Sequence, residues 1–93
     1  MILDMREVVS YTDWFVIASG RNTRQTVALA NELRKERKAE VGARPIRVEG
    51  EREGDWILLD YVDVVVHLFT PDARRYYRLD ALWGQVPVVE FAS

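Results

Sequence analysis

Apolar residues occur in short runs along the chain, and turn-forming residues separate the runs. Residues 14–18 are apolar and β-prone throughout, which is typical of a strand buried on both faces. Residues 56–60 and 63–69 form two further runs with a tight connection between them, and this pattern predicts a β-hairpin. Shorter apolar segments at 2–5 and 46–49 predict two additional strands.

Two helices are predicted from spacing and from capping residues. Asn22 is a good N-cap and Gln25 follows three residues later, which is a capping-box pattern. An apolar stripe at helical spacing comes next, and Gly42 is a plausible end of this helix. The stripe consists of Val27, Leu29, Ala30 and Leu33. Thr70 as N-cap and Pro71 at the first helical position predict a second, short helix.

The order of these elements predicts the fold class. It reads strand, strand, helix, three strands and helix, so the long helix is a crossover connection within a mixed sheet. We therefore expect an α/β fold with roughly five strands, one long crossover helix and a short C-terminal helix. The length of 93 residues allows a single domain, residues 1–93, and the apolar tail at 86–91 is expected to pack on it.

The predicted hairpin carries the most informative pattern of side chains. If residues 61–62 form a two-residue loop, Asp60 lies opposite Asp63, and Trp56 lies opposite His67. One face of the hairpin then carries Trp56, Leu58, Asp60, Asp63, Val65 and His67. The other face is purely apolar and carries Ile57, Leu59, Val64 and Val66. We expect the apolar face to pack on the core, and a face that mixes an aromatic anchor with carboxylates is typical of a protein-binding patch.

Each of these polar residues also has a plainer interpretation. Trp56 could be half-covered by the tail or by a helix, and His67 could pack on Trp56. Asp60 and Asp63 could form an acid pair, but a hairpin tip is exposed, and two hydrated carboxylates are the better interpretation. His67 is the only histidine and cysteine is absent, so the sequence offers no usual zinc site. We therefore expect no catalytic residue, no metal and no cofactor.

Charge is divided unevenly along the chain. Its net value of −2 argues against a general nucleic-acid binder. Residues 21–47, however, hold eight Arg or Lys and three Asp or Glu, whereas residues 48–72 hold one Arg and seven Asp or Glu. This division can orient a docking partner, or it can simply reflect two solvated faces. No apolar run is long enough to span a membrane, and we expect a cytoplasmic protein.

Two further segments concentrate cationic side chains. Residues 19–24 join a strand to a helix N-terminus, where free N–H groups can bind anions, but a lone glycine makes a capped turn the better interpretation. Residues 74–78 combine arginines with tyrosines, which could contact RNA through phosphates and stacking. Tyrosines at this density more often pack on a sheet, so any RNA contact is expected to be minor.

Three blocks of residues occur in a characteristic order. The first is TDWFVIASG at 12–20. The second consists of VEGE at 48–51, DWILLDY at 55–61 and DVVVH at 63–67, and the third is LWG at 82–84. In sequence and spacing these blocks resemble the ribosomal silencing factor family, also called Iojap-like proteins. The resemblance runs from about residue 3 to residue 84, almost the whole chain.

The resemblance implies a mixed-sheet domain similar to nucleotidyltransferases but without their activity. It also implies binding to a basic large-subunit ribosomal protein, the L-fourteen protein, at the face where the ribosomal subunits meet. A protein bound there blocks joining of the small subunit and represses translation, so the mechanism needs only affinity and bulk. By resemblance, Trp56, Asp60, Tyr61 and Asp63 are expected to contact the partner, and we add Val62 and His67 of the same hairpin to this expected set. Members of the family also tend to be dimers in isolation.

The chain departs from the family pattern at two places. Val62 stands where the family usually has glycine in the hairpin turn, and a β-branched residue resists positive φ. The chain also begins at its first predicted strand and lacks the helical segment that usually precedes this strand in the family.

Two other functions remain open at this point. A residual nucleotidyltransferase generally needs Gly-Ser followed by an Asp-x-Asp pair for metal, whereas this chain has Ser19-Gly20, with Asp60 and Asp63 on another hairpin. That mismatch disfavours catalysis. A direct RNA-binding module would use the basic block at 21–47 together with Arg74, Arg75 and Arg78.

Overall fold

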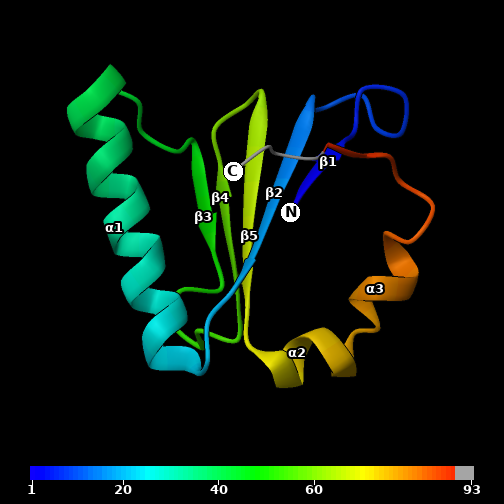
Figure 1. The fold of residues 1–93 in the computed structure, drawn as a ribbon. Coiled ribbons are helices and arrows are strands. Elements are labelled where there is room, and N and C mark those ends of the chain that lie inside the picture. Colours follow the sequence, from blue (N-terminus) through cyan, green and yellow to red (C-terminus); the bar gives the residue numbers. More distant parts are fainter. Residues whose placement is uncertain (90–93) are drawn as a thin grey trace.

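The computed structural model describes residues 1–89 and has three layers, with one sheet between a long helix and two short helices (Figure 1). The strands are β1 (Ile2–Asp4), β2 (Trp14–Ser19), β3 (Arg47–Glu49), β4 (Trp56–Asp60), β5 (Val64–Phe69) and β6 (Val88–Val89). The helices are α1 (Thr23–Val41), α2 (Pro71–Tyr76) and α3 (Leu79–Leu82). Within the described residues, no helix has the length and apolar character that a membrane span needs.

The sheet is mixed, and its strand order is β3-β4-β5-β2-β1-β6. β2 and β5 are parallel, and the other neighbouring strands are antiparallel. A parallel pair needs a crossover connection, and the segment between β2 and β5 includes α1. The predicted mixed sheet and crossover helix are therefore confirmed. The tail adds a sixth, two-residue strand by pairing with β1, and positions 90 and 91 of the predicted tail lie outside the described residues.

α1 begins and ends where its capping residues predict. The Asn22 side chain accepts a hydrogen bond from the Gln25 backbone N–H at 2.9 Å, and Gly42 ends the helix with a left-handed φ of 67°. The apolar side of α1 covers one face of the sheet, where Ala30 is buried. The residues buried with it are Ile57, Leu59, Tyr61, Val66 and Leu68. The apolar hairpin face that the sequence assigns to the core does lie under α1.

α2 and α3 cover the opposite face of the sheet. Thr70 caps α2 by accepting a hydrogen bond from the Ala73 N–H at 3.2 Å, and Pro71 occupies the first turn, as predicted. The buried residues on this face are Leu3, Met5, Phe15, Ile17, Val65, Phe69 and Leu79. Trp56 and Trp83 pack against them. Since both faces of the sheet are covered by helices, the exposed residues of the described strands lie at the end of β2 and on the outer strands β3 and β6.

The β4–β5 hairpin has a different register from the one that the sequence predicts. Asp60 lies opposite Val65 and Trp56 lies opposite Phe69, so the predicted Asp60–Asp63 and Trp56–His67 pairs are wrong. The loop consists of residues 62–63, because Tyr61 donates its N–H to the Val64 carbonyl at 2.8 Å. Relative to the prediction, each β4 residue pairs with a residue two positions later in β5. A shift by two leaves every strand side chain on the predicted face of the sheet. Asp63, which was predicted to pair with Asp60, lies in the loop instead.

The backbone conformation of Val62 accounts for the position of the hairpin loop at residues 62–63. Its φ is 78°, and the Asp63 N–H donates to the Tyr61 carbonyl at 3.1 Å, which makes a γ-turn centred on Val62. Asp60 supports the turn by accepting a hydrogen bond from the Val62 N–H at 2.9 Å. A β-branched residue at positive φ is strained, so this turn holds a valine in a conformation that suits glycine.

Val62→Gly is therefore expected to raise the free energy of unfolding by about 1 kcal/mol, because the strain removed exceeds the added entropy of the unfolded chain. Urea unfolding of the isolated protein measures this change. Asp63→Gly is the matched control, since the φ of Asp63 is not positive and glycine there only adds entropy to the unfolded chain. A Val62→Gly protein that is less stable than the wild type would contradict the turn geometry.

Candidate functional site

The hairpin tip, residues 60–63, lies at one end of the sheet (Figure 1). The loop between β1 and β2 and the C-terminal end of α1 lie at the same end. The Asp63 carbonyl accepts hydrogen bonds from the Asp13 and Trp14 N–H groups, at 3.0 and 3.1 Å, which ties the tip to the β1–β2 loop. The Ile46 N–H donates to the Asp60 carbonyl at 2.7 Å, which ties the tip to the segment before β3. Three segments distant in sequence thus meet here.

Five of the ten exposed large apolar residues in the described part of the chain belong to segments at this end. Val62 is 57% exposed, and Ile46 and Tyr11 are 70% and 61% exposed. Asp13 and Asp63 are exposed carboxylates beside them. We use the name tip surface for a subset of the exposed residues of this end, the apolar and acidic ones Val8, Tyr11, Asp13, Val41, Ile46, Val62 and Asp63; exposed Arg6 and Arg44 lie in the same segments. A surface that mixes exposed apolar groups with acids can bind a basic partner protein.

The two aspartates of the hairpin tip have different environments. Asp60 is mostly buried, with a side chain that is 14% exposed, lies 3.7 Å from the Arg47 guanidinium and caps the turn. The Asp60 carboxylate therefore stabilises the turn and the contact with β3. The Asp63 side chain is exposed and makes no ion pair among residues 1–89, so its charge is available to a partner. The two carboxylates do not form the hydrated pair that the sequence suggests, because only one of them reaches water freely.

Tyr61 points inward, toward α1. The residue is 8% exposed, and its ring lies under the guanidinium of Arg37, with 5.5 Å between the guanidinium carbon and the ring centre. Burial raises the pKa of the Tyr61 hydroxyl, and this hydroxyl has no hydrogen-bond partner within residues 1–89. It borders an apolar hollow of about 280 Å³. The hollow is lined by Val16, Leu33, Arg37, Tyr61, Val64 and Val66. Tyr61 is thus the one residue of the hairpin tip whose side chain belongs to the core.

Trp56 and His67 lie beneath α2 and α3, on the covered side of the sheet. The indole N–H of Trp56 donates to Nδ1 of His67 at 3.1 Å, so the imidazole proton is on Nε2. His67 is 4% exposed, and its ring centre is 4.5 Å from that of Phe15 and 5.3 Å from that of Trp83. Burial lowers the pKa of the imidazole to about 4, so His67 is neutral near pH 7.

The predicted exposed face carrying Trp56 and His67 is therefore wrong. Its side-chain alternation is correct, but Leu79 and Trp83 pack over it from the C-terminal segment. The plainer interpretation, in which His67 packs on a half-covered Trp56, describes the structure. Of the six residues proposed to contact a partner, Val62 and Asp63 are exposed at the tip, whereas Tyr61 and His67 are buried and Trp56 and Asp60 are partly buried.

Sequence patterns did not indicate Val8, Tyr11 and Ile46 as surface residues. Val8 and Tyr11 lie in the β1–β2 loop, and Ile46 lies just outside β3. Val8 and Tyr11 lie outside every predicted strand and helix, and this is the signal that could have found them, because such apolar residues have no predicted core to fill. Ile46 gave no such signal, because the predicted strand at 46–49 included it, whereas β3 begins at Arg47.

Comparison with known proteins identifies the family. The family model described as "Ribosomal silencing factor during starvation" matches residues 1–93. This chain belongs to the ribosomal silencing factor family. A ribosomal silencing factor from Halalkalibacterium halodurans is 42% identical over 88 residues, which cover 95% of this chain and 74% of that protein. The resemblance seen in the three sequence blocks is thus confirmed.

The relatives of this chain include solved structures. A crystal structure of a protein from Chromobacterium violaceum superposes with a TM-score of 0.82 at 38% identity, covering all of this chain and 76% of that one. A mouse relative, "Mitochondrial assembly of ribosomal large subunit protein 1", is 34% identical over 84 residues, covering 88% of this chain and 37% of that protein. The α/β fold is therefore shared by solved proteins of clear sequence similarity.

Within residues 1–89, the structure does not bring together the residues that the nucleotidyltransferase alternative would need. In the parallel β2–β5 pair, Trp14 lies opposite Val64 and Ser19 lies opposite Phe69. Ser19 and the hairpin tip are therefore at opposite ends of the sheet, roughly 16 Å apart at the usual rise per residue. Among residues 1–89, no group of three or more His, Asp or Glu side chains is placed to hold a metal ion. Ser19 and the two aspartates cannot act on one substrate atom.

Proposed function

We propose that this ribosomal silencing factor binds the L-fourteen protein of the large ribosomal subunit with its tip surface and blocks joining of the small subunit. The observation that carries the proposal is the position of Val62 and Asp63. Both are exposed on a turn held by backbone hydrogen bonds, and the Asp63 carbonyl joins this turn to the β1–β2 loop, which carries exposed Tyr11. Such a preorganised group of apolar and acidic side chains costs little entropy to dock on a basic protein.

The proposed mechanism is steric. The described fold measures about 32 × 30 × 28 Å, so a molecule docked at the intersubunit face would exclude the small subunit from that region. Repression of translation in the cytoplasm then requires no catalytic step, only occupancy of the large subunit. The name of the mouse relative associates that protein with the large subunit, which supports this choice of partner.

Asp63→Lys is expected to weaken binding to isolated large subunits by roughly tenfold, because it places a cation against a basic partner. The side chain can be changed without breaking the turn, since the interactions of Asp63 within the turn and with the β1–β2 loop use its backbone. Equilibrium co-sedimentation with large subunits measures the affinity. A light-scattering assay of subunit joining should show a matching loss of inhibition.

Glu53→Lys is the matched control for Asp63→Lys. Glu53 is an exposed acid in the turn between β3 and β4, at the other end of the sheet, and the substitution changes the net charge equally. Glu53→Lys should keep wild-type affinity. Equal losses for the two variants would mean that overall charge, and not the tip surface, controls binding, and the proposal would then fail.

A further inference from the structure

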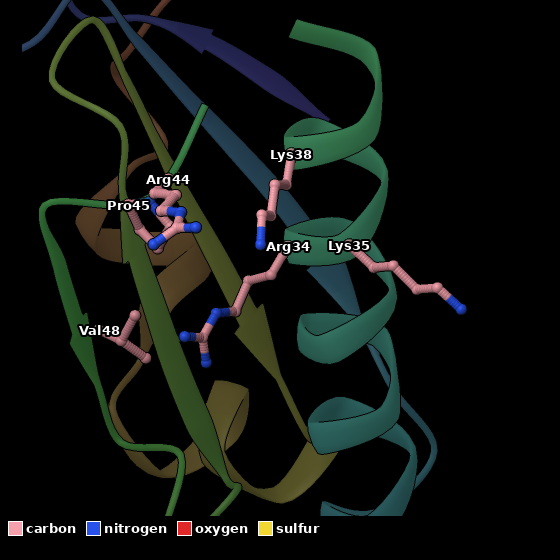
Figure 2. Close-up of a pocket in the computed structure, with 6 residues that line it drawn as sticks. All are labelled: Arg34, Lys35, Lys38, Arg44, Pro45 and Val48. Carbon is pink, nitrogen blue, oxygen red and sulfur yellow. The ribbon is translucent and has the colours of Figure 1, made fainter. Parts of the chain in front are cut away.

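A second surface of the molecule is strongly basic. A hollow of about 410 Å³ lies between α1 and the segment that leads into β3. It is lined by Arg34, Lys35, Lys38, Arg44, Pro45 and Val48, and we call it the basic groove. Figure 2 shows Arg34 and Lys38 reaching from α1 and Arg44 reaching from the facing segment into the same space, while Lys35 points away.

The cations of the basic groove are poorly compensated. Within the described part of the chain, no acidic residue lines it. Lys35, Lys38 and Arg44 make no ion pair within residues 1–89, and the one ion pair of Arg34 is a 3.4 Å contact with exposed Glu51. Arg34 and Lys38 are four residues apart on α1, where like charges repel each other. The fold therefore holds converging cations together against their own repulsion.

The shape of the groove favours an extended anionic chain over a small anion. The cations approach from two sides, and Pro45 and Val48 add apolar surface between them. A phosphodiester chain presents repeated phosphates for guanidinium and ammonium groups, with sugar and base surface in between. The groove also borders the tip surface, because Arg44 is two residues from Ile46. One docking orientation could therefore use both surfaces.

We infer that the basic groove binds the phosphodiester backbone of ribosomal RNA next to the protein site on the large subunit. This choice of RNA rests on the proposed function, since large-subunit RNA is the polyanion that a protein docked there would meet. The tip surface contacts protein, and the groove adds affinity that depends on salt. Within the basic block at residues 21–47, the cations proposed to bind RNA are thus those of the second half of α1 together with Arg44.

The test is a salt series with the double variant Lys38→Gln/Arg44→Gln. Binding to large subunits and to a fluorescent 12-nucleotide oligouridylate is measured at salt concentrations from 50 to 200 mM. Each lost phosphate contact should reduce the slope of log affinity against log salt by about 0.7 to 0.9, so the double variant should lose roughly 1.5. Its affinity at the low-salt end should fall more than at the high-salt end.

Arg21→Gln/Arg24→Gln is the control, because it removes the same charge at the other end of α1. An unchanged slope in the groove variant, or an equal change in the control, would overturn the inference. So would groove-dependent binding of a polyglutamate peptide without binding of oligouridylate, since that outcome points to an acidic protein partner.

The two proposals can fail separately in these experiments. If the wild type binds large subunits and Asp63→Lys weakens it while the groove variant keeps the wild-type slope, the groove inference fails and the proposed function stands. If the wild type does not bind large subunits but oligouridylate binding depends on Lys38 and Arg44, the proposed function fails and the groove remains an RNA site.

Discussion

Trp56→Ala is expected to lower the free energy of unfolding by about 3 kcal/mol, at the low end of values for removing a large aromatic side chain because the indole is only half-buried. The indole contacts the rings of Phe69, Trp83 and Tyr77, with ring centres 5.2 to 6.5 Å apart. Its removal also leaves Nδ1 of His67 buried without a donor. Urea unfolding followed by circular dichroism measures the loss.

Two comparison variants separate this structural role from a role in docking. Trp56→Phe keeps a ring but removes the N–H, and it should lose about 1 kcal/mol, the usual value of one hydrogen bond. Tyr76→Ala removes a ring that is 80% exposed and should change stability by less than about 0.5 kcal/mol. A Trp56→Ala protein of wild-type stability that no longer binds large subunits would show that the indole is a partner contact and not a core residue.

The second large effect is a loss of folding stability at low pH, caused by protonation of His67. His67 is neutral in the fold with a pKa of about 4, whereas an unfolded histidine titrates near 6.5. As the pH falls below about 6.5, the unfolded state takes up this proton before the folded state does. The His67 contribution to stability is therefore complete above that pH and is lost progressively toward pH 4. The total loss is about 3 kcal/mol, from the difference between the two pKa values.

His67→Gln isolates this effect from the carboxylates. Glutamine can accept the Trp56 N–H but does not titrate, so the variant keeps every other acid-sensitive group. Unfolding free energies of the two proteins are measured from pH 7.5 to pH 4, and their difference should change by the amount expected for His67. A difference that stays constant across this range would contradict a neutral, buried imidazole.

The elements of this fold could be predicted because their signals are local. Asn22, Gly42 and Thr70 act on the neighbouring turn of chain, and the structure shows each in its predicted capping role. The register of the hairpin could not be predicted in the same way. Turn rules place glycine at positive φ, and Val62 occupies that conformation against its own preference. A rule based on residue type therefore places the loop one residue too early.

The candidate site was harder to predict than the elements because it depends on packing between distant segments. Alternation correctly put Trp56 and His67 on one face of the hairpin, yet it could not show that Leu79 and Trp83 lie over that face. The tip surface likewise joins Tyr11, Ile46 and Val62 from three parts of the chain. Family resemblance predicts that the hairpin contacts a partner, and the fold shows which of its residues reach water.

The short outer strand β3 has a consequence for how copies of this protein meet one another. It offers only Arg47–Glu49 at its edge of the sheet, and its two end residues are exposed and oppositely charged. Edge-to-edge aggregation through backbone hydrogen bonds needs edge strands that are longer and less charged than this one. At the β3 edge, crowding should therefore favour contacts between side chains over fibril-like stacking, and concentrated solutions of the protein should stay dispersed.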